Sequence, residues 1–154
     1  MKSIHWIILL AAIGGLIFLM RKKISSVMTR GYKNNNPGNI RFDGETWQGE
    51  IKSDDPDFKA FKDIKWGYRA MFINLRSYFG IGVDTVEKII YRYAPPEEND
   101  TEAYIRSVCE FTGFDRSEKI DTESEETNLV AALSYHENGI TPNLTDVVAG
   151  HKLV

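Results

Sequence analysis

The chain has 154 residues, enough for one domain with a short appendage. Apolar residues make up 42% of it, which suffices for a packed core, and its net charge of -3 provides no basic face of the kind that nucleic-acid binding requires. The single cysteine, Cys109, excludes an intrachain disulfide and a Cys-based zinc site, and the three histidines lack metal-ligand spacing, so we expect no metal and no cofactor.

The first predicted element is a membrane helix. Ile4 to Met20 is an apolar run of 17 residues, which is just long enough to cross a bilayer. The basic cluster Arg21-Lys22-Lys23 follows it, and we predict a transmembrane anchor with a basic flank over residues 1–23. A cleaved signal peptide is the alternative. It is disfavoured because no A-x-A-like site follows the run and the basic residues come after the run instead of before it.

A linker and a small β region are predicted next. Residues 24–32 are polar and basic and indicate a linker, and we place the domain over residues 33–154. Asn34 to Asn39 predicts a loop, because Pro37 lacks an amide donor and Gly38 permits positive φ. Residues 40–51 predict a small β-hairpin with Asp43-Gly44 at its turn, and residues 58–61 predict a further short extended segment.

The rest of the chain predicts helices, so the expected fold class is mainly α (α+β). Apolar stripes of helical period, capping residues and glycine or proline stops mark their bounds. In chain order we expect a helix after Asp63, one after Asp84 or Thr85, one capped by Thr101, an acidic connector over residues 116–126, a helix ending at Glu137, and a short turn or helix over residues 144–149.

The helix that ends at Glu137 carries the candidate for catalysis. Leu129, Leu133 and Glu137 share one face, and Gly139 is expected as a left-handed C-terminal cap. A carboxyl group at the end of an apolar stripe is partly removed from water, which suits a general acid. The alternative is a solvated surface glutamate, which is the commoner case near a helix end.

A second group of residues suits carbohydrate binding. The run from Arg30 to Arg41 is rich in side-chain amides, which supply directional hydrogen bonds to sugar hydroxyl and acetamido groups. Trp47, Tyr93 and Tyr104 offer flat apolar faces on which sugar rings can stack. The alternatives are an ordinary asparagine-rich turn and aromatic residues of the core, with Tyr93 completing an apolar helix stripe.

The chain resembles a group of small phage-encoded lysozyme-like proteins, some of them virion structural proteins and others lytic transglycosylases. The resemblance covers about residues 30–143. It rests on the strings RGYKNNNPGNIRF, WQG, FKAFKDIKWGYRAMFINLRSYF, YAPPEENDTEAYIRSV and SYHENG. It implies a lysozyme-like domain with a small β-hairpin, and peptidoglycan glycan strands as the ligand.

The resemblance also implies roles for individual residues. Lytic transglycosylases and glucosaminidases place a catalytic glutamate on an early helix, so this chain matches their order if it is a circular permutation. Glu137 would protonate the departing glycosidic oxygen. Tyr93 would support the developing positive charge or hold an acetamido group. Asn36, Gly38 and Asn39 would shape the wall beside the acid.

The expected reaction depends on how many carboxylates the site holds. A hydrolase usually needs a second one, at about 5 Å for retention or about 6.5–9.5 Å for inversion. Glu45, Glu50 and Asp54 are candidates on or beside the hairpin, and none stands out. A lytic transglycosylase needs only one, because the C6 hydroxyl of N-acetylmuramic acid attacks the anomeric carbon, which favours that enzyme.

The sequence thus predicts a membrane-anchored peptidoglycan lytic transglycosylase that opens the wall as a phage genome enters its host. Its partners would be glycan strands, the membrane through residues 4–20, and other virion proteins. The positive-inside rule favours a cytoplasmic domain, whereas wall cleavage needs the other side, a conflict that an internal virion membrane acquired inside the host would resolve. The alternative is a non-catalytic membrane-anchored virion protein that only binds glycan.

Overall fold

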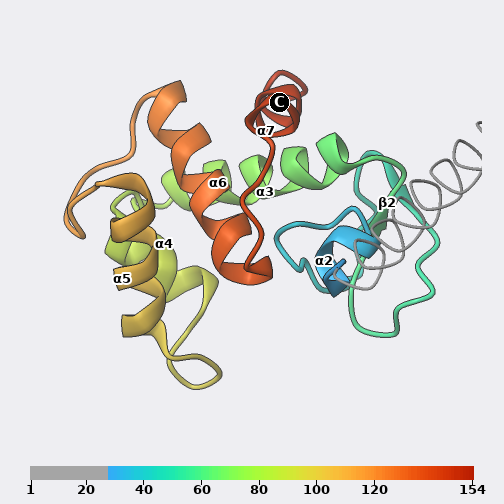
Figure 1. The fold of residues 1–154 in the computed structure, drawn as a ribbon, viewed down its shortest axis with the longest axis horizontal. Helices are drawn as coiled ribbons and strands as arrows, with labels where there is room; N and C mark the ends of the chain where they lie inside the picture. The colour runs from blue at the N-terminus through green and yellow to red at the C-terminus, as the bar shows by residue number, and fades with distance from the viewer. Residues whose placement is uncertain (1–27) are drawn as a thin grey trace, which may run out of the picture.

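A computed structural model describes residues 28–154. They form six helices and a small sheet, which Figure 1 shows. In chain order these are α2 (Arg30–Lys33), β1 (Glu50–Ile51), β2 (Ala60–Phe61), α3 (Ile64–Phe79), α4 (Val86–Tyr93), α5 (Thr101–Thr112), α6 (Glu123–Asn138) and α7 (Leu144–His151).

The helices begin at side-chain caps that satisfy their first amides. Asp63 caps α3 and Thr85 caps α4, as predicted. The cap of α5 is Asp100, one residue before the expected Thr101, whose hydroxyl instead donates to the Ala94 carbonyl. A further helix, α2, overlaps the end of the predicted linker and follows a cap at Thr29.

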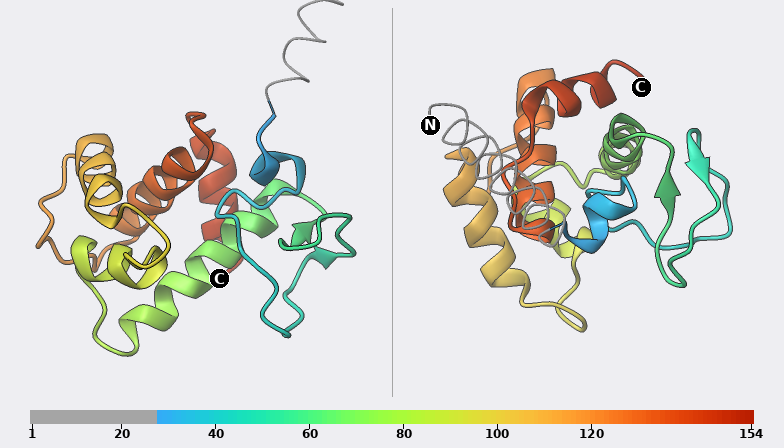
Figure 2. Two further views of the ribbon diagram at one scale, coloured as in Figure 1. Left: turned by 90° about the horizontal axis from the view of Figure 1, so that it is seen from below. Right: turned by 45° about the vertical axis from the view of Figure 1, so that its right-hand side comes forward.

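Helix α6 begins earlier than predicted and lies at the centre of the domain. Thr122 and Glu125 form a reciprocal capping box, so the first turn takes up the end of the predicted acidic connector. The segment 129–134 is buried on all sides instead of along one stripe. Figures 1 and 2 show the reason: α6 crosses in front of α3, with α4 and α5 on one side and α2 with the sheet on the other.

The sheet corrects the predicted hairpin over residues 40–51. Glu50 pairs with Phe61 and Ile51 pairs with Ala60, so β1 joins the later segment. Arg41 forms an isolated bridge with Phe58 on the same segment. The Asp43-Gly44 turn does not close a hairpin, because the chain from 43 to 50 folds around the buried side chain of Lys59.

The expected fold class is therefore corrected. The described chain is mainly helical with one two-stranded sheet, and that sheet is not the predicted hairpin of a lysozyme-like domain. No helix within residues 28–154 has the length and apolarity needed to cross a membrane. The run from Ile4 to Met20, predicted to form the membrane helix, lies outside the described residues.

Candidate functional site

The carboxylate of Glu137 is held at the C-terminal end of α6 by two donors from distant segments. The Nδ2 atom of Asn39 donates to Oε2 at 2.8 Å, and the hydroxyl of Tyr104 donates to Oε1 at 2.9 Å. The structure thus brings Glu137 together with the asparagine loop, across 98 positions of sequence. Because both oxygens have a partner, the half-buried carboxylate has a defined orientation.

Asn138, the next residue, fastens the end of α6 to the asparagine loop. Its Nδ2 atom donates to the carbonyls of Pro37 and Ser134, at 2.8 and 2.9 Å. Its Oδ1 atom accepts from the Thr29 hydroxyl at 2.5 Å. The residue is 7% exposed, so these bonds form away from water. Asn138 was predicted only as part of the helix end. Its position beside Glu137 was the one sequence feature that pointed to a role in holding the site together.

The asparagine loop is built on two left-handed residues. These are Asn35 and Asn39, with φ of 50° and 48°, instead of the predicted Gly38. Gly38 is required for close approach, because a Cβ there would lie 2.8 Å from both Met71 Cγ and the Tyr93 hydroxyl. The resulting turn directs the Asn39 side chain towards Glu137. The Oδ1 atom of Asn39 is buried and has no hydrogen-bond partner among the described residues.

Asn36 holds the loop together from inside. It is fully buried, and its Nδ2 atom donates to the carbonyls of Ile40 and Lys59, both at 2.9 Å. Its Oδ1 atom accepts from the Ile40 amide. With these bonds made, Asn36 supports the wall of the site and has no side-chain atom among those lining the cavity.

Two tyrosines pack behind the carboxylate. Tyr93 donates to the Gly38 carbonyl at 2.5 Å and meets the Tyr104 ring edge-on. Burial and the charge of Glu137 raise the pKa of Tyr93; burial, Tyr93 and Glu137 raise that of Tyr104. His136 stacks on Tyr104 at 3.6 Å between ring centroids, and burial lowers the pKa of its imidazole. Both tyrosines therefore stay neutral hydrogen-bond donors at neutral pH.

Glu137 lies between two hollows in the surface. The larger has a volume of about 470 Å³, within the usual range for ligand sites, and the smaller about 330 Å³. Glu137 and Asn99 line both. The larger is also lined by Gly38, Asn39, Ile40, Arg41, Phe42, Asp43, Trp47, Phe58, Asn74, Tyr78, Tyr93, Ala94, Pro95 and Glu98, and the smaller by Asp100, Ala103, Tyr104 and His136.

The predicted substrate-binding residues are thus distributed unevenly around these hollows. Gly38, Asn39, Trp47 and Tyr93 line the larger one together with Glu137. Tyr104 lines the smaller one. Arg41, Asp43 and Asn74 also line the larger hollow but were not predicted as site residues, although Arg41 ends the Arg30–Arg41 run and Asp43 belongs to the predicted hairpin turn.

Trp47 is fixed in the cavity wall by an ion cluster around the buried Lys59. Its indole Nε1 donates to Asp43 Oδ2 at 2.9 Å, and its backbone amide donates to Glu50 Oε2. Lys59, whose side chain is 1% exposed, binds both carboxylates, at 2.9 and 3.1 Å. Burial alone raises the pKa of Asp43, but the bonds from Lys59, the Glu45 amide and Trp47 prevail and lower it. Asp43 is therefore ionised and fully engaged at neutral pH.

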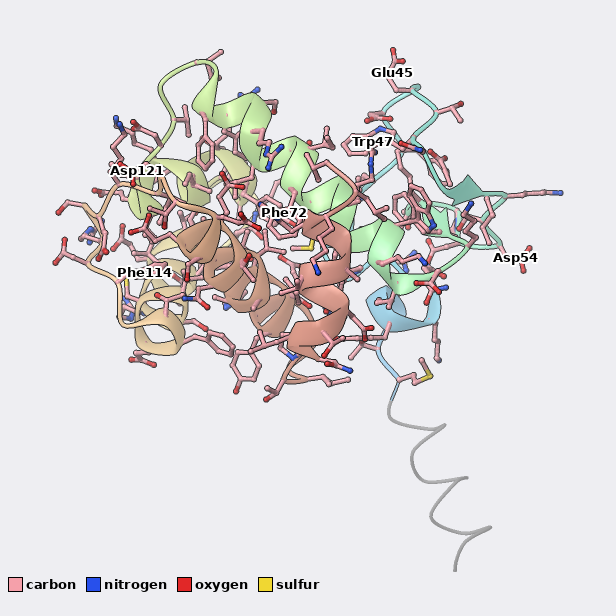
Figure 3. The ribbon with its side chains drawn as sticks, turned by 90° about the horizontal axis from the view of Figure 1, so that it is seen from above. Glu45, Trp47, Asp54, Phe72, Phe114 and Asp121 are labelled. Atoms are coloured by element: carbon pink, nitrogen blue, oxygen red, sulfur yellow. The ribbon has the colours of Figure 1, made fainter. Side chains whose placement is uncertain are left out.

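The three predicted second carboxylates do not line either hollow. Figure 3 shows Glu45 pointing outward from the tip of its loop, and Asp54 at the far edge beyond the sheet. Glu50 is bound to Lys59. The carboxylates that do line the larger hollow beside Glu137 are Asp43 and Glu98, and Glu98 is exposed on the loop before α5.

The chain was compared with known proteins. No protein-family model matches it. It is 38% identical over 153 residues to Protein P5 of Pseudoalteromonas phage PM2, an alignment that covers 96% of this chain and 94% of the phage protein. The chain belongs to the Protein P5 family. The expected phage affiliation is confirmed, and the resemblance to lysozyme-like enzymes stays a prediction.

Membership of the Protein P5 family gives the site a context without giving it a chemistry. The shared sequence runs over nearly the full length of both proteins, so it includes the segments that carry Asn39, Tyr104 and Glu137. Within residues 28–154 no group of three or more His, Cys, Asp or Glu side chains is arranged to hold a metal ion.

Proposed function

We propose that this member of the Protein P5 family is a phage virion component that cleaves the glycan strands of peptidoglycan, with Glu137 as general acid. The observation that carries the proposal is the placement of Glu137 between two hollows, oriented by Asn39 and Tyr104. A glycan strand has sugars on both sides of the bond that is cut. An acid shared by two adjoining hollows suits such a polymer better than a small ligand.

The lining of the larger hollow supports a carbohydrate ligand. Trp47 and Tyr93 present aromatic rings, and Asn39, Asn74 and Asn99 present amides. Sugars are bound by this combination, in which rings cover apolar faces of the pyranose and amides bond its hydroxyl groups. The cluster of Asp43, Glu50 and Lys59 fixes the Trp47 segment, so its ring is positioned before a ligand arrives.

The arrangement favours the lytic transglycosylase reaction over hydrolysis. Both oxygens of Asp43 are already bound, by Lys59 and by Trp47, which leaves that carboxylate poorly suited to attack or to activate water. In the proposed reaction Glu137 gives its proton to the leaving glycosidic oxygen as that bond to the anomeric carbon breaks. The C6 hydroxyl of N-acetylmuramic acid then bonds to that carbon and returns its proton to Glu137, which yields the 1,6-anhydro end.

The test is cleavage of purified peptidoglycan by the full-length chain and by Glu137→Gln. The substitution keeps the size of the side chain and removes its acidic proton, so we expect cleavage to fall about 100-fold or more. Turbidity gives the rate, and mass spectrometry identifies the ends. Glu110→Gln is the matched control, because Glu110 is exposed on α5 outside both hollows.

The products separate the remaining possibilities. Anhydromuramic ends support the transglycosylase. Reducing ends would show a hydrolase, and Asp43→Asn and Glu98→Gln would then identify its second carboxylate. Binding of peptidoglycan without cleavage by a folded parent chain would contradict the enzyme and favour a virion protein that only binds glycan.

A further inference from the structure

The larger hollow is lined by one cation, Arg41, that has no ion-pair partner among residues 28–154. Among its lining residues within 28–154, Arg41 alone is positively charged. No carboxylate of these residues lies within 4.0 Å of its guanidinium, as an ion pair would require. Two neighbouring cations differ in this respect, since Arg30 is bound to Asp55 and Asp57 and Lys59 to Asp43 and Glu50.

The guanidinium of Arg41 is nevertheless held in place. It lies over the Phe58 ring at 4.9 Å from the centroid, and its backbone forms the bridge with that residue. A guanidinium stacked on an aromatic face keeps its N–H donors in the plane, where they can bind a carboxylate in a bidentate manner. Arg30 lies over the same ring at 4.2 Å. Arg41 is thus an exposed but oriented donor group.

The other charges of the hollow do not satisfy Arg41. Asp43, two residues away, is bound by Lys59 at 2.9 Å and by Trp47. Glu137 is bound by Asn39 and Tyr104. Glu98 lies on the loop before α5. A ligand bearing a carboxylate would meet repulsion from Asp43 and Glu98 unless that carboxylate were placed at Arg41.

We propose that Arg41 binds a free carboxylate of the peptide attached to the glycan, and so selects strands whose peptides keep their carboxylates over strands whose peptide carboxyl groups are amidated. This rests on the proposed function, because it assigns a selectivity to the same hollow. Neutral sugar rings need only the aromatic and amide groups, whereas an arginine without an ion-pair partner among the described residues can bind an anionic group of the ligand. Arg41 is therefore a specificity residue and takes no part in bond breaking.

The test measures binding in a Glu137→Gln background, where no turnover interferes. The probes are a tetrasaccharide of alternating N-acetylglucosamine and N-acetylmuramic acid with its peptides, and the same molecule after its carboxyl groups are converted to amides. We expect the free-acid form to bind about fivefold more tightly, as suits an exposed ion pair. The preference should shrink with added salt, because exposed charges are screened.

Three further substitutions in that background decide the assignment. Arg41→Gln should bind both probes equally. Arg41→Lys should keep part of the preference for the free-acid probe, and its binding would show that a substitution at position 41 leaves the chain folded. Arg106→Gln, an exposed arginine on α5 outside both hollows, should keep it in full. Equal binding of both probes before Arg41 is changed, or an unchanged preference in Arg41→Gln, would overturn the proposal.

Failure of this selectivity is distinguishable from failure of the proposed function. Cleavage that depends on Glu137, together with equal binding of the two probes, would retain the enzyme and reject the role of Arg41. A preference abolished by Arg41→Gln in a chain that never cleaves would retain the selectivity in a glycan-binding protein.

Discussion

At the scale of single residues, Asn39 combines a conformational cost with a positioning role. Its left-handed backbone is unfavourable for most side chains, and its buried Oδ1 atom lacks a partner. Gly31 leaves the room for it, because a Cβ at position 31 would lie 2.9 Å from that oxygen and 2.5 Å from Asn138 Oδ1. Asparagine tolerates a left-handed backbone better than most residues, so it is the unpaired buried oxygen that supports a role for Asn39 in orienting Glu137.

Replacing Asn39 by glycine or alanine should separate these two contributions. Both variants lose the bond to Glu137 Oε2, and we expect peptidoglycan cleavage to fall about tenfold or more in each, since the acid loses its orientation. Only alanine retains a Cβ at φ 48°, so Asn39→Ala should be less stable than Asn39→Gly by about 1 kcal/mol. Urea unfolding and turbidity measure the two effects. Full cleavage by Asn39→Gly would contradict the positioning role.

At the scale of elements, the packing of α7 against α3 depends on one glycine. A Cβ at Gly150 would lie 2.5 Å from Tyr68 Cβ and 2.9 Å from two backbone atoms of α3, the Arg69 nitrogen and the Lys65 oxygen. Since backbone atoms cannot move aside as a flexible side chain can, the two helices must remain this close for α7 to stay in place. The sequence itself predicted α7 without indicating what it packs against.

Gly150→Ala should therefore destabilise the chain by about 1–3 kcal/mol, despite the higher helix propensity of alanine. Gly80→Ala is the matched control at the end of α3. Its nearest contact would be the Ser77 oxygen at 3.5 Å and its φ is -59°, so we expect a change between zero and about 1 kcal/mol of stabilisation. The free energies of unfolding in urea measure both. Similar effects at the two positions would refute the close-packing argument.

Helices were predictable from this sequence because their signals are local. Asp63, Thr85 and Gly139 cap helices as expected, since capping acts within one turn. The start of α6 was missed although the T-x-x-E pattern of Thr122 and Glu125 was present, because the acidic residues around it indicated a solvated connector.

The sheet and most of the cavity were not predictable because they depend on distant contacts. The Asp43-Gly44 pair predicted a hairpin turn. The chain forms a loop there instead, because Lys59 binds the carboxylates of Asp43 and Glu50 and the backbone carbonyl of Glu45. Glu137, Asn39 and Tyr104 could be singled out by residue type and motif. The position of Arg41 at the cavity depends on its pairing with Phe58, which no local pattern specifies.

At the scale of the whole molecule, buried tyrosines link α3, α4 and α5 to α6 and to the asparagine loop. Tyr68 is 1% exposed, and its hydroxyl lies 3.3 Å from Ser134 Oγ and 3.2 Å from the Tyr32 hydroxyl. Burial raises its pKa, as it does for Tyr93 and Tyr104. The folded state therefore keeps these phenols protonated at a pH where the unfolded chain loses their protons.

We expect the chain to lose stability as the pH rises above about 10, the ordinary pKa of tyrosine. There the unfolded state binds fewer protons than the folded one, so the free energy of unfolding falls with pH, by up to about 1.4 kcal/mol per pH unit for each such tyrosine. Lys59, whose pKa is raised by its two carboxylates against the effect of burial, acts in the same direction. Urea unfolding at pH 8 and pH 11 measures the fall.

Tyr68→Phe should make that fall smaller, whatever its effect at pH 8, because it removes one of the titrating groups. Tyr135→Phe changes an exposed tyrosine of α6 and should leave the fall unchanged. A parent chain as stable at pH 11 as at pH 8 would show that these hydroxyls are accessible to water in the folded state.

The bond between Asn39 and Glu137 joins segments that are 98 positions apart, and this has a consequence for the timing of synthesis. At about 5–20 residues per second, a ribosome needs roughly 5–20 s to pass from the first of these residues to the second. Towards the end of that interval the nascent chain carries the loop and the aromatic wall but still has no acid. Under the proposed function, the site would thus have no general acid until nearly all of the described domain has been translated.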